Sequence, residues 1–315
     1  MFREEVKNMS IDIRDINQLW LERKRSCLPP ELTYADDCDF ITEDIKTKEF
    51  IEQQAAPTLQ KGNLFVNQDK TEITTLKREN HKNETWRTVK KLGSLLGDSE
   101  DISNRKKLAS VALIKTKRVW FNKYKSISLK KKIKLYNLLV KSILLYNCST
   151  WGLTKNDEKA LNSFHRQQLR QVLGIKCPHK INCKTVYKIT NSRPISIYIT
   201  ERRWKLLGHI LRLDANTPAR KSMKFFFEKR SNKKYPGRKR ATIYTTIQRD
   251  IHKTCQKNPD FVIRKFKTEI DLHNLGVKAR NKKHWRRIVR EVVEAAYSNP
   301  AKYIPSTNQE DTNCC

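Results

Sequence analysis

Apolar residues recur at every third or fourth position along most of the chain, as they do on the buried face of an amphipathic α-helix. This periodicity predicts helices over residues 5–25, 43–59, 202–212 and 277–296. In the last two of these helices, the residues expected to face a core are Trp204, Leu207, Ile210, Leu211, Trp285, Ile288, Val289 and Val292.

The middle of the chain predicts three successive helices. The first carries an apolar stripe made of Ile102, Leu108, Val111, Ala112 and Ile114. The second, over residues 133–146, is apolar on most of its faces, so we expect it to be buried. The third, over residues 158–172, can be capped by Asn156 or Asp157 and is closed by Gly174. Three helices with basic outer faces would make a clamp able to grip a duplex by its backbone.

Short segments interrupt the helical pattern. Residues 32–41 place strand-forming residues on both sides of Ala-Asp-Asp, which predicts a strand, a turn and a second strand. Residues 64–66 predict a short strand that leads into a polar turn over residues 67–70, and residues 89–98 predict a strand with two glycine turns. The predicted fold class is therefore α+β, predominantly α, with short antiparallel strands.

The charge changes this picture more than any other feature of the composition. The 315 residues include 66 Lys and Arg against 33 Asp and Glu, which gives a formal net charge of +33. Because each Lys or Arg can neutralise a phosphate and release counterions, nucleic acid is the first candidate partner, and an anionic membrane surface is the second. The most apolar stretch, residues 138–146, is interrupted by Lys141, so no transmembrane helix is predicted. We expect a soluble protein that binds nucleic acid and no membrane.

The N-terminus and the cysteines bear on the compartment. Residues 1–5 lack an apolar signal region, so secretion is not indicated. The eight cysteines show no Cys-x2-Cys pair matched to a histidine pair, which is typical of reduced thiols in a nuclear or cytoplasmic protein. Cys177, His179 and Cys183 form the one local cluster in the sequence, where a zinc site is the minor alternative to unliganded side chains.

Asp36 and Asp37 lie at the centre of the predicted strand-turn-strand. Adjacent carboxylates at the tip of a hairpin could hold hard divalent cations such as Mg²⁺ against a phosphate. Aspartate pairs are also common in ordinary turns, where they bond to their own backbone. The spacing by itself leaves both interpretations open.

The stretch Tyr34-Ala35-Asp36-Asp37, with its apolar flanks, resembles the Tyr-X-Asp-Asp catalytic turn of reverse transcriptases. Further segments, in the same order and spacing, resemble the non-LTR (LINE-type) retrotransposon branch of that family over roughly residues 30–250. The longest of these segments are Leu135–Val140, Ile143–Trp151, Phe164–Arg170 and Arg202–Arg212.

The resemblance implies the activity of an RNA-directed DNA polymerase and a role for each matching residue. Asp36 and Asp37 would be the catalytic residues that bind Mg²⁺, and Tyr34 and Lys70 would lie at the incoming nucleotide. Lys70 belongs to an Asn-x-x-Lys-Thr segment typical of the family, although a solvated lysine in a turn remains its alternative interpretation.

The segment Leu92-Gly93-Ser94-Leu95-Leu96 resembles the hairpin that supports the primer end in this family. The resemblance therefore implies that Leu92 and Gly93 contact the primer. Lys91 stands where an aromatic residue is usual.

Two groups of basic residues are candidate nucleic-acid contacts. Arg202 and Arg203 are expected on the outer face of their helix. The densest basic run, residues 229–240, predicts an exposed arm able to lie along phosphates, while a nuclear-localisation signal and a solvated loop are its alternatives. The contacts expected from this arm are Lys233, Lys234, Arg238, Lys239 and Arg240.

The resemblance divides the chain into four parts. These are the end of a palm over residues 1–97, a helical thumb over residues 98–175, a basic helical region over residues 176–297 and a disordered tail over residues 298–315. An RNA template and a DNA primer or target are the implied partners, and the sequence indicates no oligomeric state.

Polymerase chemistry with two metal ions needs a third carboxylate opposite Asp36 and Asp37, which the family supplies from an upstream strand. Only 35 residues precede Asp36, and Asp12 and Asp15 fall in a predicted helix. We therefore expect a truncated polymerase that lacks fingers and performs no templated synthesis by itself. The alternatives are a non-catalytic protein that binds RNA or DNA through the thumb and the arm, and a chain whose unpaired palm strands prevent stable folding.

Overall fold

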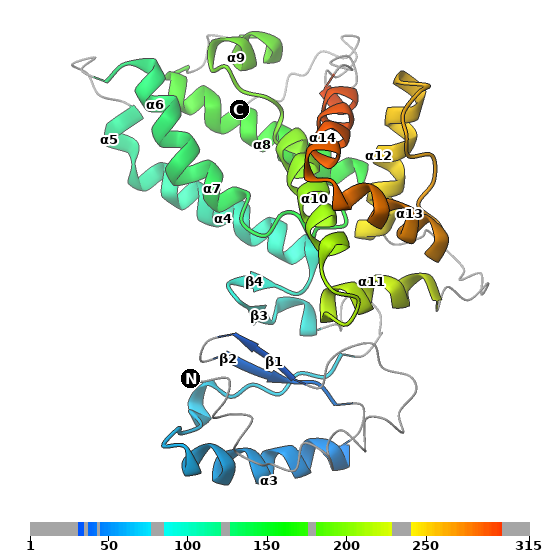
Figure 1. The fold of residues 1–315 in the computed structure, drawn as a ribbon. Coiled ribbons are helices and arrows are strands. Elements are labelled where there is room, and N and C mark those ends of the chain that lie inside the picture. The colour runs from blue at the N-terminus through cyan, green and yellow to red at the C-terminus, as the bar shows by residue number, and fades with distance from the viewer. Residues whose placement is uncertain are drawn as a thin grey trace. The chain divides into compact units, whose positions relative to one another are not determined.

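The computed structural model of this chain is mostly helical, with two small antiparallel sheets of two strands each, which confirms the α+β, predominantly α, class (Figure 1). Structural statements below concern the described residues, which are 31–34, 37–42, 45–76, 85–120, 127–175, 181–228 and 241–297. The chain divides into two compact units, one made of residues 1–74 and 214–230, the other of residues 75–213 and 231–315.

The first unit contains one hairpin, a long helix and a shorter helix, α11 (Pro218–Glu228). Strand β1 (Glu31–Tyr34) pairs with strand β2 (Asp37–Phe40), which confirms the predicted strand-turn-strand. Helix α3 (Ile45–Lys61) confirms the helix predicted over residues 43–59, and the 3₁₀ helix η1 (Gln68–Lys70) occupies the predicted polar turn.

The strand predicted over residues 64–66 is wrong. In the described chain this segment pairs with no other strand, and the side chain of Phe65 is 77% exposed. An apolar run forms a strand only where a neighbouring strand accepts its backbone hydrogen bonds.

The second unit begins with a hairpin and continues through helices. The short elements are η2 (Thr85–Thr88), β3 (Lys90–Lys91), β4 (Ser94–Leu95), α5 (Lys117–Trp120), the π-helical turn η3 (Asn137–Lys141) and α7 (Ser142–Leu144). The longer helices are α4 (Asp98–Lys115), α6 (Leu129–Tyr136), α8 (Lys155–Leu173), α9 (Cys183–Ile189), α10 (Ile195–Arg212), α12 (Ile243–Lys257), α13 (Glu269–Arg280) and α14 (Lys282–Tyr297).

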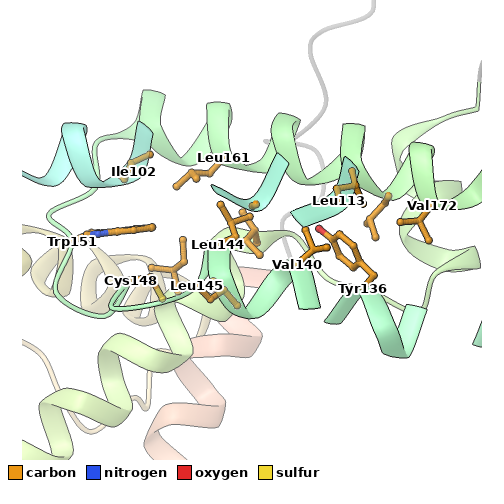
Figure 2. Packing of buried hydrophobic residues seen from close by; sticks show 14 of the residues in the cluster. Ile102, Leu113, Tyr136, Val140, Leu144, Leu145, Cys148, Trp151, Leu161 and Val172 are labelled. Carbon is orange, nitrogen blue, oxygen red and sulfur yellow. The ribbon is translucent and has the colours of Figure 1, made fainter. Parts of the chain in front are cut away.

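A hydrophobic core joins α4, the α6–η3–α7 segment and α8 (Figure 2). From the α6–η3–α7 segment it receives Tyr136, Val140 and Leu144, which are spaced by four residues and therefore share one face. Trp151 lies at the opposite end of the core from Tyr136, and Leu161 of α8 faces this segment (Figure 2). Leu145 is buried as well, whereas Leu138, Leu139 and Tyr146 are exposed, so the burial predicted for the helix over residues 133–146 is confirmed only in part.

The apolar stripe predicted for α4 is confirmed only at Ile102 and Ala112, which meet the core, and is wrong at its other positions. The buried residues of α4 are Asp101, Ile102, Arg105, Ala109 and Leu113. Three residues of the predicted stripe, Leu108, Val111 and Ile114, are exposed. The face of α4 that enters the core carries a charged pair, whose partners are given below, together with apolar residues.

Helix α8 is delimited by its end caps. Thr154 is the N-cap, and its hydroxyl accepts a hydrogen bond from the backbone N–H of Asp157 while the Asp157 carboxylate accepts one from the Thr154 N–H. The expected cap at Asn156 or Asp157 is therefore wrong, since Asp157 is the reciprocal partner in the first turn. Gly174 ends the helix at a φ of 72°, as predicted.

The C-terminal helices pack around α10, which contacts α8, α13 and α14. The helix predicted over residues 277–296 is two helices, because the chain breaks at Asn281 between α13 and α14. The predicted inward residues Trp204, Leu207, Leu211, Trp285, Ile288, Val289 and Val292 are buried, and Ile210 is half-buried.

Several predicted segments lie outside the described residues. They are the helix over residues 5–25, the arm over residues 229–240, the tail over residues 298–315, and Cys177 and His179. Where the chain is described, none of its helices has the length and apolar character needed to cross a bilayer.

Candidate nucleic-acid site

The first unit carries three of the predicted site residues on exposed positions. Tyr34 ends β1 and Asp37 begins β2, and the two residues are paired directly across the hairpin. Both are exposed, whereas Asp36 lies outside the described residues. The hairpin therefore presents the Asp37 carboxylate to solvent beside its turn.

Lys70 ends η1, and its side chain is exposed. Asn67 shapes this turn, since its side-chain oxygen accepts from the Lys70 N–H at 3.3 Å and its carbonyl accepts from the Thr71 hydroxyl at 2.9 Å. Among the described residues, Lys70 and Asp37 form no hydrogen bond or ion pair with each other. Nor do the described residues gather three or more His, Cys, Asp or Glu side chains around a possible metal position.

Asp37 has the donor chemistry that Mg²⁺ prefers, because Mg²⁺ takes one or two carboxylates and completes its shell with water and substrate phosphate. The carboxylate of Asp37 is open to solvent, so such a shell can form around it. The residue type and exposure thus fit a weakly held Mg²⁺.

The second unit carries the other predicted hairpin, β3–β4, whose turn is Leu92-Gly93. Both turn residues have positive φ, 47° for Leu92 and 78° for Gly93, as in the two-residue turns that match the twist of paired strands. Glycine adopts this conformation freely, but a leucine pays about 1–2 kcal/mol for it. The Leu92 backbone must therefore be held by its surroundings.

Two side chains from outside the hairpin hold that turn, one from α4 and one from the turn that follows α7. The Tyr146 hydroxyl donates to the Leu92 carbonyl at 2.8 Å. Arg105 Nη2 donates to the Gly93 carbonyl and to the Ser94 hydroxyl, the latter at 3.0 Å. Both turn carbonyls are thus fixed by groups outside the hairpin.

A buried carboxylate completes the arrangement. Asp101 Oδ1 accepts from the Leu95 N–H at 3.0 Å and lies 3.5 Å from Arg105 Nε, while Asp101 Oδ2 accepts from Trp151 Nε1 at 2.9 Å. The Arg105 guanidinium also lies 4.4 Å from the centre of the Tyr146 ring. We call Asp101, Arg105 and Tyr146 the hairpin clamp.

The hairpin clamp leaves one side chain of the turn in solvent. Leu92 is 52% exposed, although its carbonyl is fixed and its neighbour Ser94 is buried. The sequence pattern missed the clamp. Its only trace in the sequence is an Asp and an Arg four residues apart on one helix, which is also the spacing of a solvated pair.

The two arginines predicted to bind nucleic acid from α10 differ in position. Arg202 is exposed, and its Nη1 donates to the Leu145 carbonyl at 2.6 Å. The prediction that Arg203 lies on the outer face is wrong, because Arg203 is 1% exposed and its Nη1 lies 3.0 Å from Asp250 Oδ2. Position 203 shares a helix face with Leu207 and Leu211, so its charge is buried and paired with a carboxylate of α12.

One buried histidine plays no part in these surfaces. His165 of α8 lies between the rings of Tyr136 and Tyr187, with ring centres 6.0 Å away on each side. Neither of its nitrogens has a hydrogen-bond partner in the described chain. Burial, together with the charges of Lys141 and Arg166, lowers the pKa of His165 to about 3, so it is neutral at pH 7.

The five predicted contacts of the basic arm, Lys233, Lys234, Arg238, Lys239 and Arg240, lie outside the described residues. The described site residues therefore form two separate groups, the exposed Tyr34, Asp37 and Lys70 in one unit and the clamped Leu92-Gly93 turn in the other. Comparisons with protein-family models, with curated proteins and with solved structures found no match to this chain.

Proposed function

We propose that this chain supplies the end of the palm and the thumb of an RNA-directed DNA polymerase of the non-LTR retrotransposon type. The observation that carries the proposal is the clamped turn, in which a fixed backbone presents the exposed Leu92. A group that positions a reacting strand end must itself be held rigidly. The resemblance of Leu92-Gly93 to a primer-supporting hairpin agrees with this geometry.

The roles of the remaining residues follow from their chemistry. Mg²⁺ held by Asp36 and Asp37 would supply the Lewis acid of nucleotidyl transfer. Lys70 would neutralise a phosphate of the incoming nucleotide. Tyr34, which is paired with Asp37 across the hairpin, would also lie beside that nucleotide. The work of the second unit is to bind the primer and the template and to place the primer end.

Binding of a recessed primer end tests this proposal. We compare a labelled RNA–DNA hybrid that has a recessed DNA 3′ end with a blunt hybrid of equal length, using fluorescence anisotropy and the full chain. The wild type should prefer the recessed end, and Leu92→Asp should lose this preference. Leu138→Asp is the matched control, because Leu138 is similarly exposed in η3 and remote in sequence from the turn. Equal preference in the wild type and Leu92→Asp would refute the proposal.

Catalysis by the chain alone is a separate question. Two-metal catalysis needs a third carboxylate near Asp36 and Asp37, and the described residues gather no such group around Asp37. We therefore expect no primer extension with Mg²⁺ or Mn²⁺. Incorporation of nucleotides that disappears in Asp36→Ala would contradict this expectation.

A second candidate function is nucleic-acid binding without chemistry, and the net charge of +33 favours it. It predicts strongly salt-dependent binding with no preference for a recessed end. Neutralising Lys233, Lys234, Arg238, Lys239 and Arg240 together should then weaken binding to every nucleic acid alike.

A further inference from the structure

Helices α10 and α14 pack against each other in the second unit (Figure 1). Residues of both helices line a groove of about 630 Å³. Six basic side chains line this groove, and Glu201 is the one acidic residue among those that line it. The basic residues are Arg193, Lys205, Arg212, Lys282, Arg286 and Arg290. No motif of the sequence pointed to this combination, because its two walls are separated by about 70 residues.

The charges of the α10 wall are largely satisfied within the protein. Glu201 pairs with Lys205 at 2.6 Å and with Arg193 at 3.3 Å, and these contacts lower the pKa of Glu201. Arg212 Nη1 donates to the Ala279 carbonyl at 3.2 Å. This wall therefore contributes one basic group, Arg212, that lacks an acidic partner in the described chain.

The charges of the α14 wall are not satisfied in this way. Lys282, Arg286 and Arg290 are exposed, and none of them forms an ion pair with a described carboxylate. They are spaced by four residues, so they follow one another along one side of the helix at steps of about 6 Å. Such a row of equal charges matches a ligand that carries negative charges at regular intervals.

The floor of the groove offers little else to a ligand. It is formed by Trp285, Val289 and Val293, whose side chains are only 3%, 6% and 7% exposed. The Trp285 Nε1 donates to the Trp204 carbonyl at 3.0 Å, so the indole is held within the core. An amphipathic helix would gain little from so small an apolar area, and a base would find no free ring on which to stack.

We propose that the α10–α14 groove binds the phosphate backbone of single-stranded nucleic acid, through charge and without sequence preference. A single strand can follow the row of charges on α14 with its successive phosphates, as it does in other basic grooves that track the backbone. The proposal rests on the proposed function only in that both take nucleic acid, since it involves neither the hairpin clamp nor the Leu92 side chain.

The test measures binding of labelled single-stranded oligouridine and oligothymidine by the full chain at several salt concentrations. The groove variant is Lys282→Gln with Arg286→Gln and Arg290→Gln. The control variant, Lys155→Gln with Lys159→Gln and Lys184→Gln, removes the same charge from exposed positions outside the groove. For the groove variant, the slope of log K against log salt should become less negative by about 2, and the affinity at 0.1 M salt should fall on the order of 100-fold.

The control variant should change both quantities much less, and equal effects of the two variants would overturn the proposal. A further variant, Glu201→Gln, removes the acid of the groove and frees Arg193 and Lys205. It should bind single strands several-fold more tightly, and an unchanged or weaker affinity would also contradict the proposal. Because Glu201→Gln gains affinity, its result does not depend on whether the triple variant folds.

Two additional arms separate the possible outcomes. Binding of oligouridine and oligothymidine to the same extent supports recognition of the phosphates. If instead an acidic peptide binds in the groove, and the groove variant binds both oligonucleotides as tightly as the wild type does, the groove belongs to a protein partner and the proposal is overturned. Leu92→Asp should leave single-strand affinity unchanged, and the groove variant should leave the preference for a recessed end unchanged. Failure of the groove proposal and failure of the polymerase proposal are therefore distinguishable.

Discussion

The buried His165 makes the stability of the second unit depend on pH in a way that one substitution should abolish. In the folded protein the pKa of His165 is lowered to about 3, and an unfolded histidine has a pKa of about 6.5. Below pH 6.5 the unfolded chain therefore takes up a proton that the folded chain cannot. The free energy of unfolding falls as the pH falls from 6.5 toward 3.

The size of the effect follows from this difference in pKa. Each pH unit within that window costs about 1.4 kcal/mol, so the contribution of His165 is a loss of about 2 kcal/mol between pH 6.5 and pH 5. His165→Phe removes the titration and keeps a planar ring between Tyr136 and Tyr187. At pH 7 we expect the stabilities of the two proteins to agree within about 1.5 kcal/mol, because the larger ring must be accommodated while two unbonded nitrogens are removed.

The assay is urea unfolding at pH 7, 6 and 5, followed by tryptophan fluorescence. Five of the six tryptophans belong to the second unit, so this signal reports mainly on it; they are Trp86, Trp120, Trp151, Trp204 and Trp285. His165→Phe should become more stable relative to the wild type by about 2 kcal/mol between pH 7 and pH 5. His209→Phe is the control, because His209 is exposed on α10, and it should follow the wild type. Parallel stability curves for the wild type and His165→Phe would refute the reasoning.

Three further substitutions test packing and polar contacts within the second unit. Asp250→Ala should lower the free energy of unfolding by about 3–5 kcal/mol, because Arg203 would keep a buried charge without its carboxylate; an effect no larger than that of the exposed Asp260→Ala in urea unfolding would contradict this. Gly208→Ala should lower the free energy of unfolding by about 1–3 kcal/mol, since a methyl group there would lie 2.0 Å from Trp285 Nε1. An unchanged thermal midpoint would show that α10 and α14 separate easily. Tyr146→Phe removes the hydroxyl that bonds to the Leu92 carbonyl, so it should cost about 1 kcal/mol and speed amide exchange of Leu95; unchanged exchange would mean that Arg105 and Asp101 hold the turn without it.

The sequence predicted a helix correctly where its apolar spacing and the residues typical of helix ends indicated the same bounds. The spacing of Trp285, Ile288 and Val292 predicted the buried face of α14, and Gly174 marked the end of α8. Both signals are local, since they depend on residues within a few turns of one another. The strand-turn-strand around Tyr34 and Asp37 was accessible for the same reason.

The errors have a common physical cause. Periodicity treats every charged residue as exposed, but Arg105 and Arg203 are buried because each meets a carboxylate inside the fold. The face of α4 that carries Asp101 and Arg105 enters the core, and so three residues of the predicted stripe, Leu108, Val111 and Ile114, lie in solvent. The roles of Asp36, Asp37, Tyr34, Lys70 and Leu92 at a polymerase site remain predictions.

The sequence by itself determined the helical class of this protein, the ends of several helices and a strongly basic surface. Each of these depends on composition or on neighbours along the chain. Only the tertiary structure decided which charges are buried, how the Leu92-Gly93 turn is held and where the α10–α14 groove lies. The reason is that these features join residues up to about 100 positions apart, and a contact of that kind depends on how the helices pack, which no local pattern encodes.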